Sequence, residues 1–363
     1  MDFTLSAEQL MIKDSVERYA AGAHGADDWA AFANLGWLGI GAPEELGGFG
    51  GATETLILME AFGRGLVRAP YVPQVVVAGA ILAAAGRNDA LERLVEGAER
   101  WTVAYDEAQA NGDPAAAETN AARDGDAFTL RGTKMRVFGA PTAQSLIVSA
   151  RTGDEITLFA VPVNAAGVTV TPYDSEDGHD VAGVQFNGVR VDAESMLGPL
   201  GGGSGLLEPA LDRGIAALCA EGVGLMSAML EMTVAYTKQR QQFGVPIASF
   251  QALQHRMAEM FIELELARSM AYVAAMTLQD AAGEPARRRG ISGAKVQIAK
   301  SGRFIGQNAI QLHGGIGMSE EYKVGHYFKR MTMVERLYGG AAYHLERYAA
   351  ETAGATARET VTA

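Results

Sequence analysis

The sequence predicts a multidomain α+β protein with three regions in succession: an N-terminal helical domain, a middle antiparallel β-barrel or sandwich, and a C-terminal four-helix bundle. Three observations carry this prediction. Apolar residues recur at helical spacing in the first hundred residues and again beyond residue 204. Between them lie short runs of β-branched and aromatic residues, bounded by Gly, Asp and Pro. We therefore expect domains at residues 1–100, 101–197 and 198–350, followed by a frayed tail at 351–363.

The N-terminal region is predicted to contain helices around a glycine-rich loop. Ser6, with Gln9 three residues later, forms a capping-box pattern that opens the first helix. Four glycines within residues 47–51 make a helix or strand costly there. Helical patterns return at residues 53–63 and 72–98.

The middle and C-terminal regions differ in the spacing of their apolar residues. β-prone runs lie at residues 128–130, 145–149, 156–161 and 168–171. Beyond Ser204, leucine and methionine recur at helical spacing on both sides of a glycine-containing break, and the methionines suit core filling. Because long amphipathic helices need mutual burial, we expect them to form the four-helix bundle.

Composition excludes several classes of protein. The 363 residues carry a net charge of −13 and 48% apolar residues, with no basic stripe of the kind that binds nucleic acid. A single cysteine, Cys219, excludes an internal disulfide and suits a reducing cytosol. The most apolar run, residues 75–85, is too short to span a bilayer, and the N-terminus lacks a secretory pattern. We expect a cytoplasmic protein with no nucleic-acid or membrane partner.

Two strings in the C-terminal region carry the clearest chemical information. They are Arg240-Gln241-Gln242-Phe243-Gly244 and Gln311-Leu312-His313-Gly314-Gly315. The planar guanidinium of arginine can bond two phosphate oxygens at once. Paired glycines let backbone N–H groups approach an anion. Together the strings predict a grip on a pyrophosphate, and we interpret the histidine as a packed residue rather than a catalyst.

In this order the two strings resemble the flavin-binding signatures of the acyl-CoA dehydrogenase family. The resemblance extends over almost the whole chain, and its other matching segments are residues 3–9, 35–40, 42–51, 130–134 and 184–191. It implies FAD as the cofactor, an acyl-CoA thioester as the substrate of α,β-desaturation, and an electron-transfer flavoprotein as the electron acceptor.

The resemblance also implies which residues bind the cofactor. In the family, FAD lies between two protomers: the β-domain of one holds the isoalloxazine ring, and the bundle of the other clamps the pyrophosphate and adenosine. The clamp positions in this chain are Arg240, Gln242, Phe243, Phe250, Gln251, Gln311, Gly314 and Gly315.

The catalytic base is missing from both positions that the family uses. The usual glutamate follows a tyrosine after the Gly-Gly motif, and the matching residue here is Gly339. Some members place the glutamate on the first bundle helix, where this chain has Gly214. Asp212 is the best substitute, although two residues on a helix turn a side chain by about 200°. Glu221 and His344 rank below it.

The ring-binding half departs from the family pattern as well. Where the family has Thr-Glu-Pro-Gly-x-Gly-Ser, residues 106–112 read Asp-Glu-Ala-Gln-Ala-Asn-Gly. Arg136 replaces a tryptophan that could cover a flavin face, and Phe138 replaces a threonine whose hydroxyl lies near N5. The phosphate clamp therefore persists while the ring contacts do not.

This asymmetry leads to our first hypothesis, a partner subunit of an α2β2 acyl-CoA dehydrogenase. It resembles the small, base-lacking subunit of heteromeric enzymes associated with dicarboxylic and steroid side-chain substrates. A complete homologous chain would supply the ring contacts and the glutamate. The alternatives are a homotetrameric flavoenzyme with an unusual base, a non-redox scaffold or acyl-CoA-binding module, and a flavin monooxygenase on the same fold.

Two further segments carry weaker signals. Residues 174–180 contain side chains that can bind metals, but they lack calcium-loop spacing, so we expect a surface loop and no metal site. Residues 201–205 are glycine-rich without the strand-to-helix context of a dinucleotide fingerprint.

Overall fold

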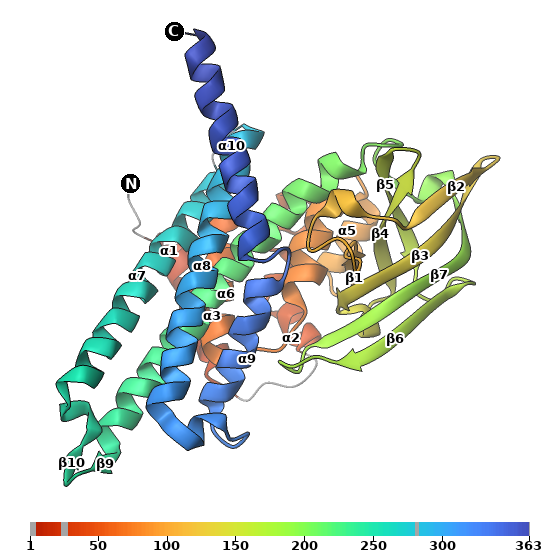
Figure 1. The fold of residues 1–363 in the computed structure, drawn as a ribbon. Coiled ribbons are helices and arrows are strands. Elements are labelled where there is room, and N and C mark those ends of the chain that lie inside the picture. Colours follow the sequence, from red (N-terminus) through yellow and green to blue (C-terminus); the bar gives the residue numbers. More distant parts are fainter. Residues whose placement is uncertain (1–4, 23–27, 280–282, 363) are drawn as a thin grey trace. The chain divides into compact units, whose positions relative to one another are not determined.

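The computed structural model describes residues 5–22, 28–279 and 283–362 and confirms the order of helical, β and helical regions (Figure 1). The chain forms two compact units. One, called here the bundle unit, comprises residues 1–24, 52–67 and 215–363. The other, the β-unit, comprises residues 25–51 and 68–214.

The β-unit is built on one eight-stranded sheet, paired in the order β6-β7-β3-β2-β4-β5-β8 with β1 beside β4. Most pairings are antiparallel as expected, but β1 and β2 both pair with β4 in parallel. The strands are β1 (Trp101–Ala104), β2 (Asn120–Asp124), β3 (Ala127–Phe138), β4 (Ser145–Thr152), β5 (Glu155–Pro162), β6 (Val168–Asp174), β7 (Asp180–Asp192) and β8 (Met196–Leu197).

Buried residues, many of them alternating with exposed ones along these strands, form one continuous core. Leu130, Val148 and Phe159 are among its fully buried members. The helices of this unit are α2 (Trp29–Asn34), α4 (Ala78–Ala84) and α5 (Asn88–Val95), with a π-helical segment at Val72–Val77 before α4.

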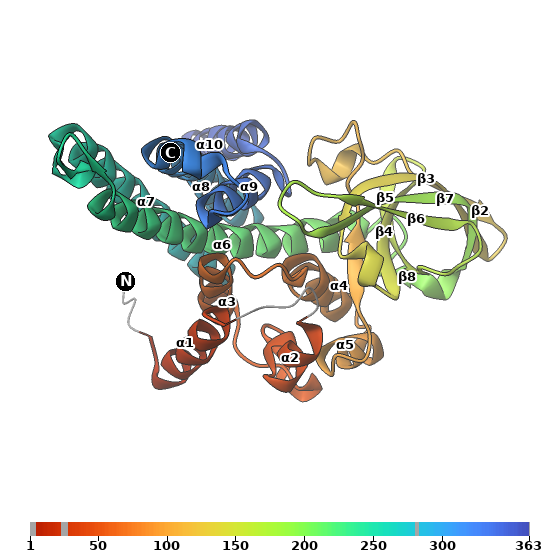
Figure 2. The ribbon, with the colours of Figure 1, turned by 90° about the horizontal axis from the view of Figure 1, so that it is seen from below.

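The bundle unit consists of long helices, and the capping box predicted at its first helix is present at Ser6 and Gln9. Helix α8 packs against α7, α9 and α10, and α3 packs against α1 and α7 (Figure 2). The helices are α1 (Ala7–Ala20), α3 (Ala52–Gly65), α6 (Gly203–Gln239, shared with the β-unit), α7 (Gln251–Gln279), α8 (Glu284–His313), α9 (Lys323–Arg336) and α10 (Ala341–Thr362).

Helix α10 continues through Thr362, so the stretch for which the sequence predicts a frayed tail has a helical backbone. Its alanines, glutamates and arginine are good helix formers. Helix α6 is long and apolar enough to cross a membrane by length and composition, but 83% of that apolar window is buried within the protein. It is the core helix of the bundle.

Helices α3 and α6 cross at two glycines. A Cβ on Gly63 would lie 2.0 Å from the carbonyl oxygen of Glu221, and a Cβ on Gly224 would lie 2.0 Å from that of Glu60. Because neither backbone can retreat without moving its helix, only glycine permits this approach. The crossing brings the N-terminal helices into the same unit as the C-terminal ones.

A buried ion pair lies inside the β-unit. The Nζ of Lys134 donates to Glu107 Oε1 at 2.6 Å, to Ser149 Oγ at 3.0 Å and to the Tyr105 carbonyl at 3.2 Å. Glu107 also accepts the backbone N–H groups of residues 118–119. All of the lysine's donors therefore have acceptors, which is what makes a fully buried ammonium tolerable.

Burial alone would raise the pKa of Glu107, but the Lys134 charge and the hydrogen bonds to the carboxylate lower that pKa from 4.5 to about 2. Burial lowers the pKa of Lys134 to about 8 despite the attraction of Glu107. Since the carboxylate pKa is lower in the folded state, its contribution to stability is present above pH 4.5 and is lost as the pH falls toward 2.

We predict that Glu107→Gln lowers the free energy of unfolding at pH 7 by about 3 kcal/mol, because it leaves a buried lysine without its counter-charge. The variant should also lose part of the acid sensitivity between pH 4.5 and 2. Urea unfolding followed by near-UV circular dichroism measures both. Asp124→Asn, at the exposed Arg190–Asp124 pair, is the control and should change stability by less than about 1 kcal/mol. Equal effects of the two variants would contradict the prediction.

Candidate functional site

The first predicted string forms a tight hairpin at the end of α6. The Arg240 N–H closes the last helical turn on the Tyr236 carbonyl at 2.8 Å. Strands β9 (Gln241–Gln242) and β10 (Val245–Pro246) then pair antiparallel around a two-residue turn. Both turn residues, Phe243 (φ 54°) and Gly244 (φ 79°), are left-handed, as a type I′ hairpin requires. A bulky side chain seldom adopts this conformation.

The hairpin projects its side chains away from the bundle unit. Phe243 is 92% exposed and touches Phe250 edge-on, with ring centroids 6.0 Å apart. Arg240 is exposed and makes no ion pair within residues 5–22, 28–279 and 283–362. Its guanidinium is therefore available to an anion, and the phenylalanine at the tip lacks a cover within the described chain.

The second string ends α8. Gly314 has φ 63° and ψ −142°, a conformation open only to glycine, and its N–H bonds back to the carbonyls of Gln311 and Ile310. A Cβ on Gly314 or Gly315 would meet no atom within 4 Å. The space beside these two α-carbons is open, which leaves room for a ligand to approach the backbone closely.

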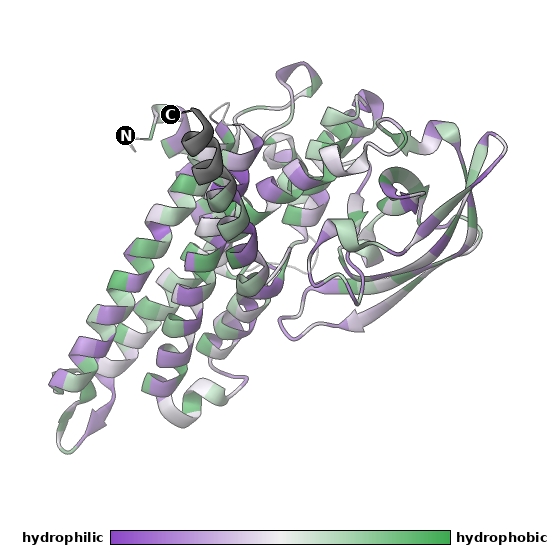
Figure 3. Ribbon diagram, turned by 45° about the horizontal axis from the view of Figure 1, so that its top comes forward, coloured by the Kyte–Doolittle hydropathy of each residue, from purple (hydrophilic) through white to green (hydrophobic). Residues whose placement is uncertain are grey.

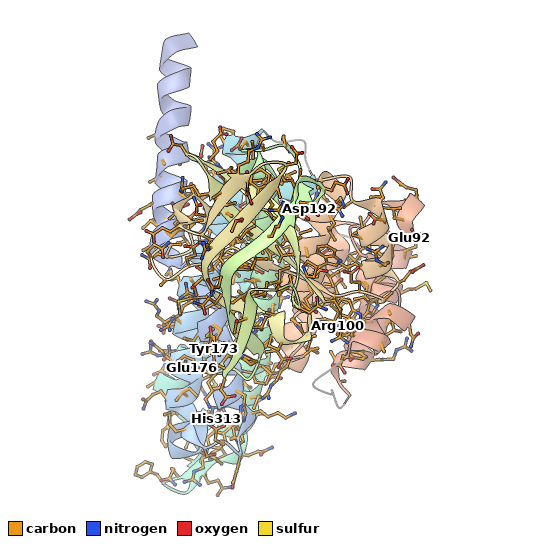
Figure 4. The ribbon with its side chains drawn as sticks, turned by 90° about the vertical axis from the view of Figure 1, so that its right-hand side faces the viewer. Glu92, Arg100, Tyr173, Glu176, Asp192 and His313 are labelled. Atoms are coloured by element: carbon orange, nitrogen blue, oxygen red, sulfur yellow. The ribbon has the colours of Figure 1, made fainter. Side chains whose placement is uncertain are left out.

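Aromatic stacking joins the two strings. The ring of His313 lies 4.6 Å from that of Tyr236 at an interplanar angle of 27°, one helical turn before Arg240. Tyr322 packs against the other two rings at 5.0 and 6.2 Å. Figure 4 shows His313 toward one end of the bundle. The strings therefore lie at the same end of one bundle, although they are distant in sequence.

His313 is held neutral by its surroundings. Burial lowers its pKa, and its Nδ1–H donates to the Ala309 carbonyl at 2.7 Å. Its Nε2 is then a buried acceptor without a partner among the described residues. The side chain packs between tyrosines, in line with our interpretation of it as a packed residue.

All eight predicted clamp residues are exposed in the bundle unit. They bring together an unpaired guanidinium, three side-chain amides, two bare glycines and two aromatic rings. This donor set fits the charged, phosphate-bearing part of a dinucleotide. It includes no titratable group of the kind that abstracts a proton, so it suits binding rather than acid–base catalysis.

The position of the family base is built around glycine. Gly339 has φ 98°, and a Cβ there would lie 2.5 Å from Tyr343 Cδ1 and 3.1 Å from His344 Nε2. Tyr338 before it is also left-handed, at φ 57°. A glutamate at this position would need both a strained backbone and displacement of a packed ring.

Buried polar side chains hold the backbone of the same turn through hydrogen bonds. Lys295 Nζ donates to the Leu337 carbonyl at 2.8 Å and also to the Val334 carbonyl. His344 is fully buried, with Nε2 bound to the Tyr338 carbonyl at 3.0 Å and Nδ1 3.2 Å from the Ser292 hydroxyl. Burial and the Lys295 charge lower the pKa of His344 to about 3.

The candidate substitute bases are hydrogen-bonded to other residues or buried. Glu221 forms a buried bidentate pair with Arg330 at 2.5 and 2.8 Å. Both nitrogens of His344 are bonded inside the bundle. Asp212 lies within α6 and is only 1% exposed. Neither Glu221 nor His344 has the free acceptor and solvent access that proton abstraction requires.

The ring-binding segments of the β-unit are bonded to each other. Arg136, left-handed at φ 51° beside a bulge in β3, pairs with Asp106 at 2.7 Å. The N–H of Met135 donates to the Asp106 carbonyl at 2.8 Å. Phe138 is 8% exposed, and its carbonyl accepts the Thr102 hydroxyl at 2.6 Å. Arg136 and Asp106 therefore neutralise each other, although Asp106 Oδ1 is buried without a hydrogen-bond partner among the described residues.

The segment expected as a surface loop, residues 174–180, is a compact turn. Ser175 Oγ donates to Asp177 Oδ1 at 2.5 Å, and Asp177 Oδ2 lies 3.2 Å from His179 Nδ1. Both Asp177 and His179 are buried, which the sequence analysis missed. The described part of the chain contains no group of three or more His, Cys, Asp or Glu side chains able to hold a metal.

Three family models match the chain in succession. They describe the acyl-CoA dehydrogenase N-terminal domain (residues 6–98), middle domain (residues 102–189) and C-terminal domain (residues 201–352).

Similar proteins and structures carry related names. The probable acyl-CoA dehydrogenase YngJ of Bacillus subtilis is 31% identical, covering 92% of this chain and 95% of that protein. The ChsE4-ChsE5 complex of Mycobacterium tuberculosis contains a chain with a TM-score of 0.85 and 27% identity, covering 97% of this chain and 99% of that one. A variant of the Tcur3481-Tcur3483 steroid ACAD has a TM-score of 0.86 and 30% sequence identity, covering 98% of this chain and 100% of that one.

We predict that Gly339→Ala lowers the free energy of unfolding by about 2 kcal/mol, because it forces a left-handed non-glycine residue against Tyr343. Gly340→Ala is the matched control, since a Cβ there meets nothing within 4 Å. Thermal unfolding of the two variants beside the parent measures the difference. Equal stability of the two variants would show that the turn is not built around Gly339.

Proposed function

The chain belongs to the acyl-CoA dehydrogenase family, and we propose that it serves as the base-lacking subunit of a heteromeric enzyme of that family. The family's enzymes are oxidoreductases that act on the CH–CH bond of acyl-CoA thioesters. In this proposal a homologous partner carries the catalytic glutamate, and the present chain holds the phosphate end of the partner's FAD.

One observation carries the proposal: the clamp faces outward from the bundle unit. Phe243 is 92% exposed at the tip of a left-handed turn, beside a guanidinium without an ion-pair partner among the described residues. Exposing a phenylalanine in an uncommon conformation is unfavourable unless another surface covers it. A ligand and a partner chain at this end of the bundle would account for both features.

Five of the eight clamp residues have a specific task in this proposal. Arg240 offers two parallel donors to phosphate oxygens, and the open space beside Gly314 and Gly315 lets a phosphate approach the backbone closely. The exposed amides of Gln242 and Gln311 add uncharged donors. Bound FAD supplies the acceptor for the hydride that leaves the acyl chain. The present chain thus contributes binding and orientation, while proton removal falls to the partner.

The relatives support a heteromeric arrangement. Two structurally similar chains come from structures named for two different components, ChsE4-ChsE5 and Tcur3481-Tcur3483, and the second name includes a steroid enzyme. We propose acyl-CoA thioesters with a steroid side chain or fatty acyl group as the substrate class, and an electron-transfer flavoprotein as the electron acceptor. A homotetramer with its own base is the alternative, and the best substitute base for it is Asp212, which is buried in α6.

We predict that Arg240→Ala lowers the FAD affinity of the purified complex by about 10- to 100-fold, since a charge-assisted hydrogen bond contributes about 1.5–3 kcal/mol. Flavin absorbance after dialysis, against total protein, measures the retained FAD. The control is Arg256→Ala, an exposed arginine that pairs with Glu259 at 3.7 Å. Unchanged FAD retention in the Arg240 variant would remove this account of the clamp.

We further predict that the chain purified alone is colourless, whereas the complex with its homologous partner holds one FAD for every two chains. Each such pair has one complete site, because only the partner contributes ring contacts. Flavin release and subunit counting by native mass spectrometry give the ratio. A yellow, active chain in the absence of any partner would favour the homotetramer.

A further inference from the structure

The hairpin that carries Arg240 has no buried side chain of its own. Every residue from Arg240 to Pro246 is exposed, and hydrophobic and hydrophilic residues are mixed at this end of the bundle unit (Figure 3). The backbone of the hairpin is tied to the helix before it. The Arg240 N–H donates to the Tyr236 carbonyl, and the Ile247 N–H donates to the Arg240 carbonyl, both at 2.8 Å. The position of the guanidinium therefore depends on how the end of α6 is held.

Two neighbouring residues hold that end of α6 against different helices. Thr237 is fully buried, and its hydroxyl lies 3.4 Å from Met257 Sδ of α7. Tyr236 is half-buried and stacks on His313, the last residue of α8. Tyr322, the residue before α9, packs edge-on to Tyr236 and at a tilt against His313. The stacked rings thus join the end of α6 to the end of α8 and the start of α9.

The glycine turn after α8 also rests on the histidine. Residues 314–316 are exposed, whereas Gly317 is buried. A Cβ on Gly317 would lie 3.0 Å from both His313 Cβ and the Ile310 carbonyl oxygen, so the turn folds back closely onto the end of the helix. The ring itself is held in one orientation, since its Nδ1–H donates to the Ala309 carbonyl at 2.7 Å. A displacement of this ring would therefore displace the turn.

A histidine in this stack carries a cost that a phenylalanine would not. Its Nε2 is buried without a hydrogen-bond partner among the described residues. Protonation would place an unsatisfied N–H donor and a charge there. Burial lowers the pKa of His313 below its usual 6.5, although the hydrogen bond to Ala309 opposes this shift. The titratable groups that face the ring, the phenols of Tyr236 and Tyr322, are uncharged at neutral and acidic pH.

We propose that the stack of Tyr236, His313 and Tyr322 positions the two strings of the clamp against each other, and that it does so only while His313 is uncharged. This inference rests on the proposed function, and it adds regulation of the same site by pH. His313 is then a positioning residue: its ring is buried, and it acts through Arg240 and the glycine turn.

The direction of the pH dependence follows from the lowered pKa. A released His313 ring accepts a proton more readily than a stacked one, so protons favour the released state. The stack therefore has its full stability above pH 6.5 and loses stability as the pH falls below that value. FAD should accordingly leave the complex more readily in mild acid than at neutral pH.

Hydrogen exchange of the purified complex, after FAD has been removed by dialysis, tests the positioning without the cofactor. In His313→Ala, the backbone amides of Arg240 and Ile247 in the hairpin and of Ser319 after the turn should all exchange at least about tenfold faster than in the parent. His313→Phe keeps a ring of similar shape and should retain slow exchange in both segments. Faster exchange in one segment only, or in neither, would overturn the stack as the link between them.

A second variant guards against misfolding of His313→Ala. Tyr236→Leu removes a half-buried ring and leaves the buried histidine in place, and it should accelerate exchange in the same two segments. Unchanged exchange in a folded Tyr236→Leu variant would count against the stack in the same way.

The pH profile of FAD retention tests the requirement for an uncharged ring. We expect the parent complex to lose affinity for FAD by about 3- to 10-fold relative to His313→Phe as the pH falls from about 7.5 to about 5.5, because phenylalanine cannot be protonated. His255→Phe, at an exposed histidine of α7, is the matched control and should keep the profile of the parent. Identical profiles for the parent and His313→Phe would overturn the pH dependence.

This inference and the proposed function fail in different ways. If Arg240→Ala retains FAD while the His313 variants alter exchange in both segments, the stack joins the strings but the proposed clamp is wrong. If Arg240→Ala releases FAD while His313→Ala leaves both exchange and FAD retention unchanged, the clamp stands and the positioning role of His313 is wrong.

Discussion

The turn at Gly339 is the constraint on which the rest of this account depends. Its backbone is left-handed, Tyr343 occupies the space that a Cβ would need, and Lys295 and His344 bond the neighbouring carbonyls. A carboxylate cannot be restored there by a single exchange without rebuilding the turn. The turn therefore requires a glycine at the position where the family resemblance leads us to expect the base.

The two units divide the remaining functions unequally. In the β-unit, Arg136 and Asp106 bond to each other, and Phe138 is buried in place of a polar ring contact. In the bundle unit, Arg240, Gln311 and Gly315 remain exposed and free to bind. The charge of Arg136 is already paired within the chain, whereas the exposed donors around Gly315 gain from a ligand. A missing base and a retained clamp are both consistent with the role that we propose.

Local signals in the sequence predicted local structure well. The Ser6–Gln9 capping box and the break between the two long helices before Phe250 are present, since caps and glycine turns depend on neighbouring residues. The fold class followed from the spacing of apolar residues along the sequence and from the family resemblance. The two strings proposed as the clamp were recognised by motif, but the sequence could not show that Tyr236 and His313 stack to join them, because that contact depends on tertiary packing.

Long-range packing accounts for what the sequence did not reveal. The joining of α3 to the C-terminal helices depends on Gly63 and Gly224, which as isolated letters indicate nothing. The buried Lys134 had a signal that was overlooked: it stands at an inward position of β3, in phase with Phe128 and Leu130, and an inward lysine requires a partner such as Glu107.

A cryo-electron microscopy map of the complex isolated from the native host would test the central claim most directly. Our account predicts that the FAD pyrophosphate lies against Arg240 of this chain, while the isoalloxazine ring and the nearest carboxylate belong to the other chain. A map with FAD seated in this chain's own β-unit, and with a carboxylate of this chain directed at the ring, would contradict it.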